Sequence, residues 1–232
     1  MNLPKISKRL EAAASFCRRG VRIADVGTDH AYLPIYLYAA GKISGGVASD
    51  INEGPVQRAR VHIAHSEAKR AIEVLRTDGL SEIEPFAPDD IFILGMGGEL
   101  IASIIDRAEW VKDGKYRLIL QPMTHSEILR EYLYKNGFSI IGEELVKEEK
   151  IYHIICAEYS GEKYSPTQEE LIFGKKNLER GGELLYELMA RTREIYARRI
   201  EGKAVSGADA TEETEVLKMI DRINGGLVHD RT

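Results

Sequence analysis

The fold of this 232-residue chain is decided by Val21-Arg22-Ile23-Ala24-Asp25-Val26-Gly27-Thr28-Asp29-His30-Ala31-Tyr32-Leu33. The apolar run 21–26 predicts a buried strand, which ends in a turn that contains Gly27. Apolar residues then recur at helical spacing as far as Ala40, and Gly41 stands where a helix stop is expected. A strand, a glycine turn and a helix open a nucleotide-binding βαβ unit, which presents backbone N–H groups at the carboxyl end of its strand.

The glycine content of this turn restricts the ligand. A dinucleotide site needs three glycines so that a pyrophosphate can approach the backbone. Here Gly27 has no glycine partner in the turn, and Asp29 stands in the place of the second glycine. A carboxylate repels a pyrophosphate but tolerates a cationic ligand such as the sulfonium of S-adenosylmethionine. The turn therefore favours a methyl donor over NAD, while an ordinary tight turn in an α/β protein stays equally open.

The composition is that of a globular protein of one α/β domain with a small appendage. The chain is 44% hydrophobic and 30% charged, with a formal net charge of −5. We expect no membrane span and, from the polar first ten residues, no secretion signal. The two cysteines, Cys17 and Cys156, have no metal-ligand spacing and predict no disulfide framework, so a reducing cytoplasm is the expected location.

Acidic residues follow two further predicted strands. Asp50 ends the strand 45–49, where it can accept hydrogen bonds from ribose hydroxyls, although capping of the next helix explains it as well. Asp78 follows the strand 72–76 and precedes Gly79, so its carboxylate can accept the exocyclic amine of adenine. Together with the first turn, these acids predict an adenosine-binding edge of the sheet.

The remaining pattern completes an α/β sheet. Helices are predicted over 6–17 and 55–69, and the strand 91–94 runs into a glycine-rich turn, 95–98, followed by a helix. The strand 117–120 ends at Gln121-Pro122, a helix starts near Ser126, and the strands 139–146 and 151–159 form a hairpin. We therefore predict a Rossmann-like class I methyltransferase sheet that is mostly parallel, has an antiparallel last strand, and carries a small C-terminal helical domain.

Several segments resemble one family: DVGTDHAYLPIYL, ASDIN, LRTDGL, ILGMGGELI, LILQPMTHSEILR and IYHIICAEY. Over most of residues 5–160 the chain is similar to the bacterial tRNA (adenine-N1)-methyltransferases, which modify adenine 22 of tRNA with S-adenosylmethionine. The resemblance implies a methyltransferase domain over 1–160 and a helical, coiled-coil-like domain over 161–232. It also implies tRNA as substrate and no metal ion, and it leaves the oligomeric state open, with a monomer as one option.

Site residues follow from the fold, the acids and this resemblance. Asp29 is the predicted catalytic residue, because a carboxylate beside the exocyclic amine stabilises the positive charge that develops on the methylated ring. The residues predicted to bind the cofactor are Asp25, Gly27, Asp50, Asp78, Gly79 and Gly95. The residues predicted to bind the substrate base are His30, Tyr32, Met96, Gly97, Gly98, Gln121 and Pro122. For His30, capping of the following helix is an equally open interpretation, and for His125 we expect no functional role.

The sequence pattern of the C-terminal region predicts helices over 168–177, 183–202 and 211–224. The second of these helices has a narrow apolar seam near heptad spacing: Leu184, Leu188, Ile195 and Arg199. Basic residues interleaved with acids suggest that this region helps to hold tRNA: Lys175, Lys176, Arg180, Arg191, Arg193, Arg198 and Arg199. Two other functions remain open. One is a noncatalytic adenosine-binding module that binds RNA, and the other is a methyltransferase that acts on a different RNA or on a small molecule.

Overall fold

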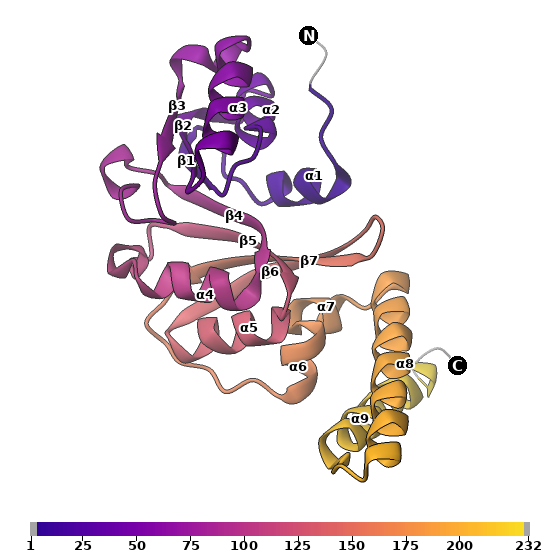
Figure 1. Cartoon of the computed structure of the whole chain (residues 1–232). Coiled ribbons are helices and arrows are strands. Elements are labelled where there is room, and N and C mark those ends of the chain that lie inside the picture. Colours follow the sequence, from indigo (N-terminus) through magenta and orange to yellow (C-terminus); the bar gives the residue numbers. More distant parts are fainter. Residues whose placement is uncertain (1–3, 230–232) are drawn as a thin grey trace. The chain divides into compact units, whose positions relative to one another are not determined.

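The computed structural model describes residues 4–229, with side chains described for 4–223. The chain divides into two compact units, Met1–Ser165 and Pro166–Thr232. Figure 1 shows a twisted sheet flanked by helices in the first unit and helices alone in the second. No helix in the described part of the chain combines the length and apolarity needed to cross a membrane.

The first unit is built on one seven-stranded sheet with the order β3-β2-β1-β4-β5-β7-β6. Its five N-terminal strands pair in parallel, whereas β7 pairs antiparallel with both β5 and β6. This arrangement confirms the predicted sheet. The strands are β1 (Val21–Val26), β2 (Ile43–Asp50), β3 (Ile72–Arg76), β4 (Asp90–Gly97), β5 (Arg117–Thr124), β6 (Phe138–Lys147) and β7 (Ile151–Tyr159).

Helices cover both faces of the sheet and form two apolar cores. On one face, α1 (Lys8–Ser15), α2 (Tyr32–Ala39) and α3 (Glu53–Ala64) pack against inward side chains such as Ile23 and Phe92. On the other face, α4 (Gly98–Asp106) and α5 (Ser126–Lys135) pack against the alternate residues of the same strands. Because side chains alternate along a strand, Asp25 points to the same face as Ile23, toward α1 and α2.

Two predicted boundaries in the first unit were wrong, and in the second unit the helix predicted over 168–177 is broken at Gly174. The helix expected over 55–69 ends at Ala64, and a short 3-10 helix, Glu67–Arg70, follows it. Ser66 causes the break, since its hydroxyl donates to the Ile63 carbonyl at 2.8 Å and accepts the Ala68 N–H at 3.1 Å. The glycine-rich segment 95–98 is not a free turn: β4 continues through Gly97, with register shifts against β5 on both sides of Met96.

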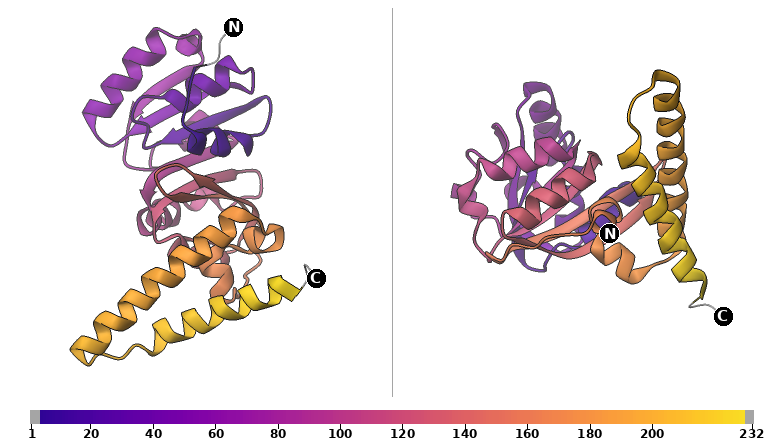
Figure 2. Two further views of the ribbon diagram at one scale, coloured as in Figure 1. Left: turned by 90° about the vertical axis from the view of Figure 1, so that its right-hand side faces the viewer. Right: turned by 90° about the horizontal axis from the view of Figure 1, so that it is seen from below.

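The second unit contains α6 (Gln168–Phe173), α7 (Lys175–Arg180), α8 (Glu183–Ser206) and α9 (Thr211–His229). Its two long helices meet at their connecting loop, and the chain runs toward this loop along α8 and away from it along α9 (Figure 2). The ion pairs between them agree with this, because Lys203 pairs with Glu213 near the loop and Arg193 pairs with Asp221 farther along. The predicted seam on α8 was wrong: the buried residues of this helix are Leu185 and Met189, while Ile195 is 49% exposed.

Candidate active site

The candidate site lies where the strand order changes direction, between β1 and β4 at their carboxyl ends. In open α/β sheets, ligands bind in the crevice that forms at such a point. The turn after β1 is held against β2, because the N–H groups of Gly27 and Thr28 both donate to the Ser49 carbonyl at 2.8 Å. The chain therefore leaves β1 along a fixed path toward α2.

Gly27 is required by both its conformation and its surroundings. Its φ of +81° lies in the left-handed region, which favours glycine. A Cβ at this position would lie 2.1 Å from the terminal methyl carbon of Met96, so a side chain there would displace that of Met96. Two predicted site residues, Gly27 and Met96, are thus in contact at the ends of β1 and β4.

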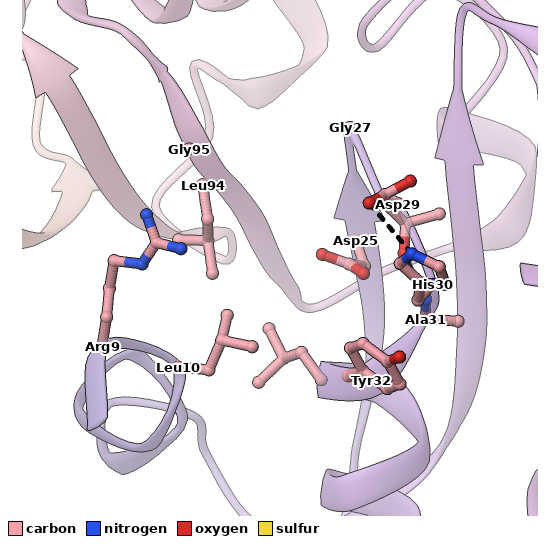
Figure 3. A pocket seen from close by; sticks show the side chains of 12 residues that line it. Arg9, Leu10, Asp25, Gly27, Asp29, His30, Ala31, Tyr32, Leu94 and Gly95 are labelled. Atoms are coloured by element: carbon pink, nitrogen blue, oxygen red, sulfur yellow. Dashed lines mark hydrogen bonds and ion pairs between the residues drawn. The ribbon is translucent and has the colours of Figure 1, made fainter. Parts of the chain in front are cut away.

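A pocket of about 340 Å³ opens at this turn. Figure 3 shows Arg9 and Leu10 on one side of it and the turn after β1 on the other, with Asp25 between them. Six of the residues that line it are predicted site residues: Asp25, Gly27, Asp29, His30, Tyr32 and, in β4, Gly95. The lining residues that the sequence did not point to are Arg9, Leu10, Thr28, Ala31, Leu33 and Leu94.

Asp25 is the buried acid of this pocket. The residue is only 7% exposed, and burial raises its pKa from an ordinary 3.8 to about 6. A hydrogen bond with Thr28 partly opposes this rise in pKa, while the negative charge of Asp50 adds to it. Such a carboxylate gains most from a cationic partner, because the partner restores the stabilisation that burial removes.

Asp29 is the exposed acid of the same pocket. Its side chain is 62% exposed and ion-pairs with Arg58 of α3, and its second oxygen lies 3.1 Å from His30 Nε2. Figure 3 draws the latter contact as a dashed line. A carboxylate accepts about four hydrogen bonds, so Asp29 can still accept one from a ligand while its orientation is fixed by Arg58 and His30.

Three aromatic rings stack beside this acid. The His30 ring lies 5.0 Å from that of Tyr32 and 5.1 Å from that of His62, with interplanar angles of 14° and 22°. His62 also contacts the His30 carbonyl through Nδ1 at 3.0 Å. The Tyr32 and His62 rings also lie 5.4 Å apart, so the three rings form one cluster, in which Tyr32 is 48% exposed. His62 and Arg58 were missed from the sequence because both lie on a helix 28 or more residues further along the chain.

The acids after β2 and β3 differ from each other in their partners. Asp50 accepts the N–H of Asn52 at 2.7 Å, which is a local turn contact at the start of α3. Asp78 is half exposed and forms a two-pronged ion pair with Arg107, at 2.8 and 3.3 Å. The hydrogen bond from Arg107 holds the pKa of Asp78 below its ordinary value. Gly79 has a φ of +57° and faces the side chain of Ile104.

The ends of β4 and β5 are closely packed, with the exception of Gly95. A Cβ on Gly95 would meet nothing within 4 Å, whereas one on Gly98 would lie 2.1 Å from the His125 carbonyl oxygen. Gln121 is completely buried and donates to the carbonyl of the equally buried Pro122 at 2.9 Å. Gly97, Gly98, Gln121 and Pro122 do not line the pocket. Gly98 is a glycine because the backbone after β5 passes against it.

Both cysteines of the chain are free and buried. Burial raises the pKa of the Cys17 and Cys156 thiols to about 12, so both remain protonated. Residues 4–223 contain no group of three side chains suited to hold a metal ion. His125 is the left-handed residue before α5, with its Nδ1 3.3 Å from Glu127.

Comparisons with known proteins agree with this geometry. The family described as "Methyltransferase domain" matches residues 6–155. The tRNA (adenine(22)-N(1))-methyltransferase of Bacillus subtilis is 42% identical over 159 residues, which are 68% of this chain and 67% of that protein. The solved structure of the B. subtilis m1A22 tRNA methyltransferase TrmK covers 95% of this chain and 96% of its own, with 32% identity and a TM-score of 0.79. A candidate tRNA (m1A22) methyltransferase of Streptococcus pneumoniae, solved with S-adenosyl-L-methionine, covers 93% and 99%, with 32% identity and a TM-score of 0.83.

Proposed function

The chain belongs to the tRNA (adenine(22)-N(1))-methyltransferase family, and we propose on this basis that it transfers a methyl group from S-adenosylmethionine to N1 of adenine 22 in tRNA. One structural observation carries the proposal. The pocket at the switch point of the sheet places a buried acid, Asp25, beside an exposed acid, Asp29. The two carboxylates suit a ligand with cationic groups better than a pyrophosphate.

The residues at the strand ends fit S-adenosylmethionine. Asp25 would accept the α-ammonium group, and the open space beside Gly95 would accommodate the methionine chain. Asp50, at the end of the next strand, would accept the ribose hydroxyls. Adenine would lie toward β3, near Asp78 and Gly79, where Asp78 keeps acceptor capacity beside its ion pair with Arg107.

S-adenosylmethionine supplies an electrophilic methyl group, which adenine N1 attacks with its lone pair as the carbon–sulfur bond breaks and the sulfur becomes a neutral thioether. Positive charge then moves onto the adenine ring. Asp29 would accept a hydrogen bond from the exocyclic amine of this ring, and that bond strengthens as the charge develops. Arg58 and His30 hold the Asp29 carboxylate at the pocket mouth, so little reorganisation is needed during the reaction.

The base must leave its stack in the tRNA before N1 is accessible. The exposed Tyr32 ring, in its cluster with His30 and His62, would contact the flipped adenine. We assign Met96, Gly97, Gly98, Gln121 and Pro122 an indirect part in substrate binding. Their packing sets the backbone at the ends of β4 and β5, which borders the pocket at Gly95.

The second unit supplies a surface for the body of the tRNA. Its α8 carries four exposed basic side chains, which can contact phosphates: Arg191, Arg193, Arg198 and Arg199. A substrate of this kind implies that the protein acts in the cytoplasm. In this division of tasks, residues 1–160 bind the methyl donor and transfer the methyl group, and 161–232 hold the tRNA.

Nucleoside mass spectrometry tests the proposal. Unmodified tRNA is incubated with the protein and methyl-labelled donor, and a matched transcript with guanine at position 22 serves as the control. We expect labelled 1-methyladenosine from the first transcript and none from the second. Donor binding without methylation of any RNA would favour a noncatalytic adenosine-binding module instead. Label at another position, or in a small molecule, would favour a different methyltransferase.

A further inference from the structure

The turn after β1 contains a residue in a backbone conformation that is rare for side chains with a Cβ. Ala31 has a φ of 57° and a ψ of 27°, which is the left-handed region. It is buried and stands directly before α2, and Figure 3 shows it with Asp29 and His30 on one side of the pocket. Such conformations persist only where neighbouring groups hold them, and they are concentrated at functional sites.

Two side chains hold the peptide group between His30 and Ala31. Its N–H donates to the Thr28 hydroxyl at 3.1 Å. Its carbonyl oxygen lies 3.0 Å from Nδ1 of His62, and because a carbonyl oxygen only accepts, His62 donates through Nδ1. Both polar groups of this peptide therefore have partners, and the partner of the carbonyl comes from a different element, α3.

The helix α3 contacts the same turn at a second point. Arg58, four residues before His62, ion-pairs with Asp29. Residues four apart lie on the same face of a helix, so Arg58 and His62 face the turn together. The ion pair orients one side chain, whereas His62 holds the main chain that carries Asp29 and Tyr32.

We propose that His62 is a positioning residue for methyl transfer, whose Nδ1–H holds the His30 carbonyl so that the Asp29 carboxylate stays aimed at the target adenine. The inference rests on the proposed function. His62 does not line the pocket, so it acts through the main chain of the turn. A group that assists a reaction must stay close to its productive geometry, and a displacement of about 1 Å can cost about 100-fold in rate. The hydrogen bond from His62 therefore matters more for the rate of methyl transfer than for binding of the donor.

Three substitutions at His62 separate its hydrogen bond from its ring. His62→Asn removes the ring but keeps an N–H donor at the δ position, His62→Phe keeps a ring without a donor, and His62→Ala has neither. With donor and tRNA saturating, the Phe and Ala variants should lower the single-turnover rate constant about 10-fold and change donor affinity by less than about 2-fold. The Asn variant should stay within about 3-fold of the wild-type rate, because its amide can still donate to the carbonyl.

Two comparisons test whether the effect belongs to the turn. His65→Phe is the matched control, because Nδ1 of His65 also contacts a carbonyl, that of Val61 at 2.7 Å, but this carbonyl belongs to α3 itself. His65→Phe should methylate tRNA like the wild type. In an Asp29→Asn protein, His62→Phe should lower the rate constant by less than about 2-fold, because a positioning residue loses its effect when the group that it positions is removed.

NMR of the imidazole nitrogens gives a readout that does not depend on activity. At about pH 8 the His62 ring of the free protein should carry its proton on Nδ1, and a proton on Nε2 would overturn the proposal. A loss of rate in His62→Asn as large as that in His62→Ala would also overturn it, since the donor would then have no effect. Donor affinity that falls in step with the rate would overturn it in favour of a purely structural role. If the wild-type protein bound the donor but methylated no tRNA, the proposed function would fail, and this role of His62 with it.

Discussion

Replacing Asp25 with Asn should stabilise the unliganded protein while impairing its binding of the methyl donor. Burial raises the pKa of Asp25 from 3.8 to about 6, so the folded protein prefers the protonated carboxyl group. Protonation of Asp25 therefore stabilises the folded state. This stabilisation is fully present below the unfolded-state pKa of 3.8 and is lost as the pH rises through the folded-state pKa of about 6. Each tenfold change in proton affinity is worth about 1.4 kcal/mol, so the ionised carboxylate costs about 3 kcal/mol at pH 7.5 and about 1 kcal/mol at pH 4.5.

Asn keeps the shape of the side chain and can accept the hydrogen bond from Thr28, but it never carries the charge. Asp25→Asn should therefore raise the free energy of unfolding by at most about 3 kcal/mol at pH 7.5, which corresponds to a melting temperature higher by about 6 to 12 °C. The gain should shrink to about 1 kcal/mol at pH 4.5. Urea unfolding at the two pH values measures both numbers, and Glu73→Gln, which removes an exposed acid on β3, is the matched control.

Donor binding gives the second half of this test. The ammonium group of the donor needs an ionised partner, so wild-type affinity for S-adenosylhomocysteine should increase between pH 5 and pH 7 and that of Asp25→Asn should not. The reasoning would be refuted if Asp25→Asn were no more stable than the wild type at pH 7.5, or if its gain in stability were the same at both pH values. Either result would mean that the buried carboxylate does not carry the cost inferred from its environment.

Three further sets of substitutions test other parts of the structure. Asp29→Asn should lower the single-turnover rate constant of methylation by roughly 10²-fold, the usual size for a preorganised electrostatic partner, with donor affinity nearly unchanged. A near wild-type rate would leave positioning alone as the source of catalysis. Gly98→Ala should destabilise the protein by about 1–3 kcal/mol in urea because its Cβ would meet the His125 carbonyl, whereas Gly202→Ala, with open space on α8, should stabilise it by about 0.5–1 kcal/mol. Four exposed arginines of α8 can be neutralised together: Arg191, Arg193, Arg198 and Arg199. Their neutralisation should weaken tRNA binding and reduce its salt dependence without changing donor affinity. An unchanged dependence of tRNA affinity on salt would exclude a role of this surface in tRNA binding.

Local patterns predicted the sheet well, because strands of this fold are short apolar runs that end in turn residues. The segments 21–26, 72–76 and 151–159 form strands with the predicted bounds. The helix expected over 55–69 was too long, because an apolar stripe does not reveal that Ser66 binds the backbone on both sides of the break. The three glycines of segment 95–98 predict a turn. The pairing of this segment with β5 could not be predicted locally, because β5 lies 20 or more residues later in the chain.

Most of the pocket residues that the sequence predicted belong to β1 and the turn after it, and the residues contributed by α1 were missed. Asp25, Gly27, Asp29, His30 and Tyr32 are close in sequence, so one motif contains them all. Arg9 was not predicted as a pocket residue, because the apolar stripe of α1 does not indicate its contacts with Met123 and Tyr152. Those contacts join residues more than 100 positions apart, a separation over which spacing gives no information.

The acids at the strand ends show why residue type alone does not assign a role. Asp25 lies near the end of β1, and Asp29 and Asp78 follow β1 and β3. Asp25 is buried, whereas the side chains of Asp29 and Asp78 are 62% and 50% exposed. The buried carboxylate is costly to ionise, so it suits a permanent cation that arrives with the ligand. An exposed carboxylate held by Arg58 is ionised in any case, so Asp29 can respond to charge that develops only during the reaction. The same residue type can therefore bind the donor at one position and assist the transfer four residues later, because the depth of each carboxylate in the pocket sets its response to charge.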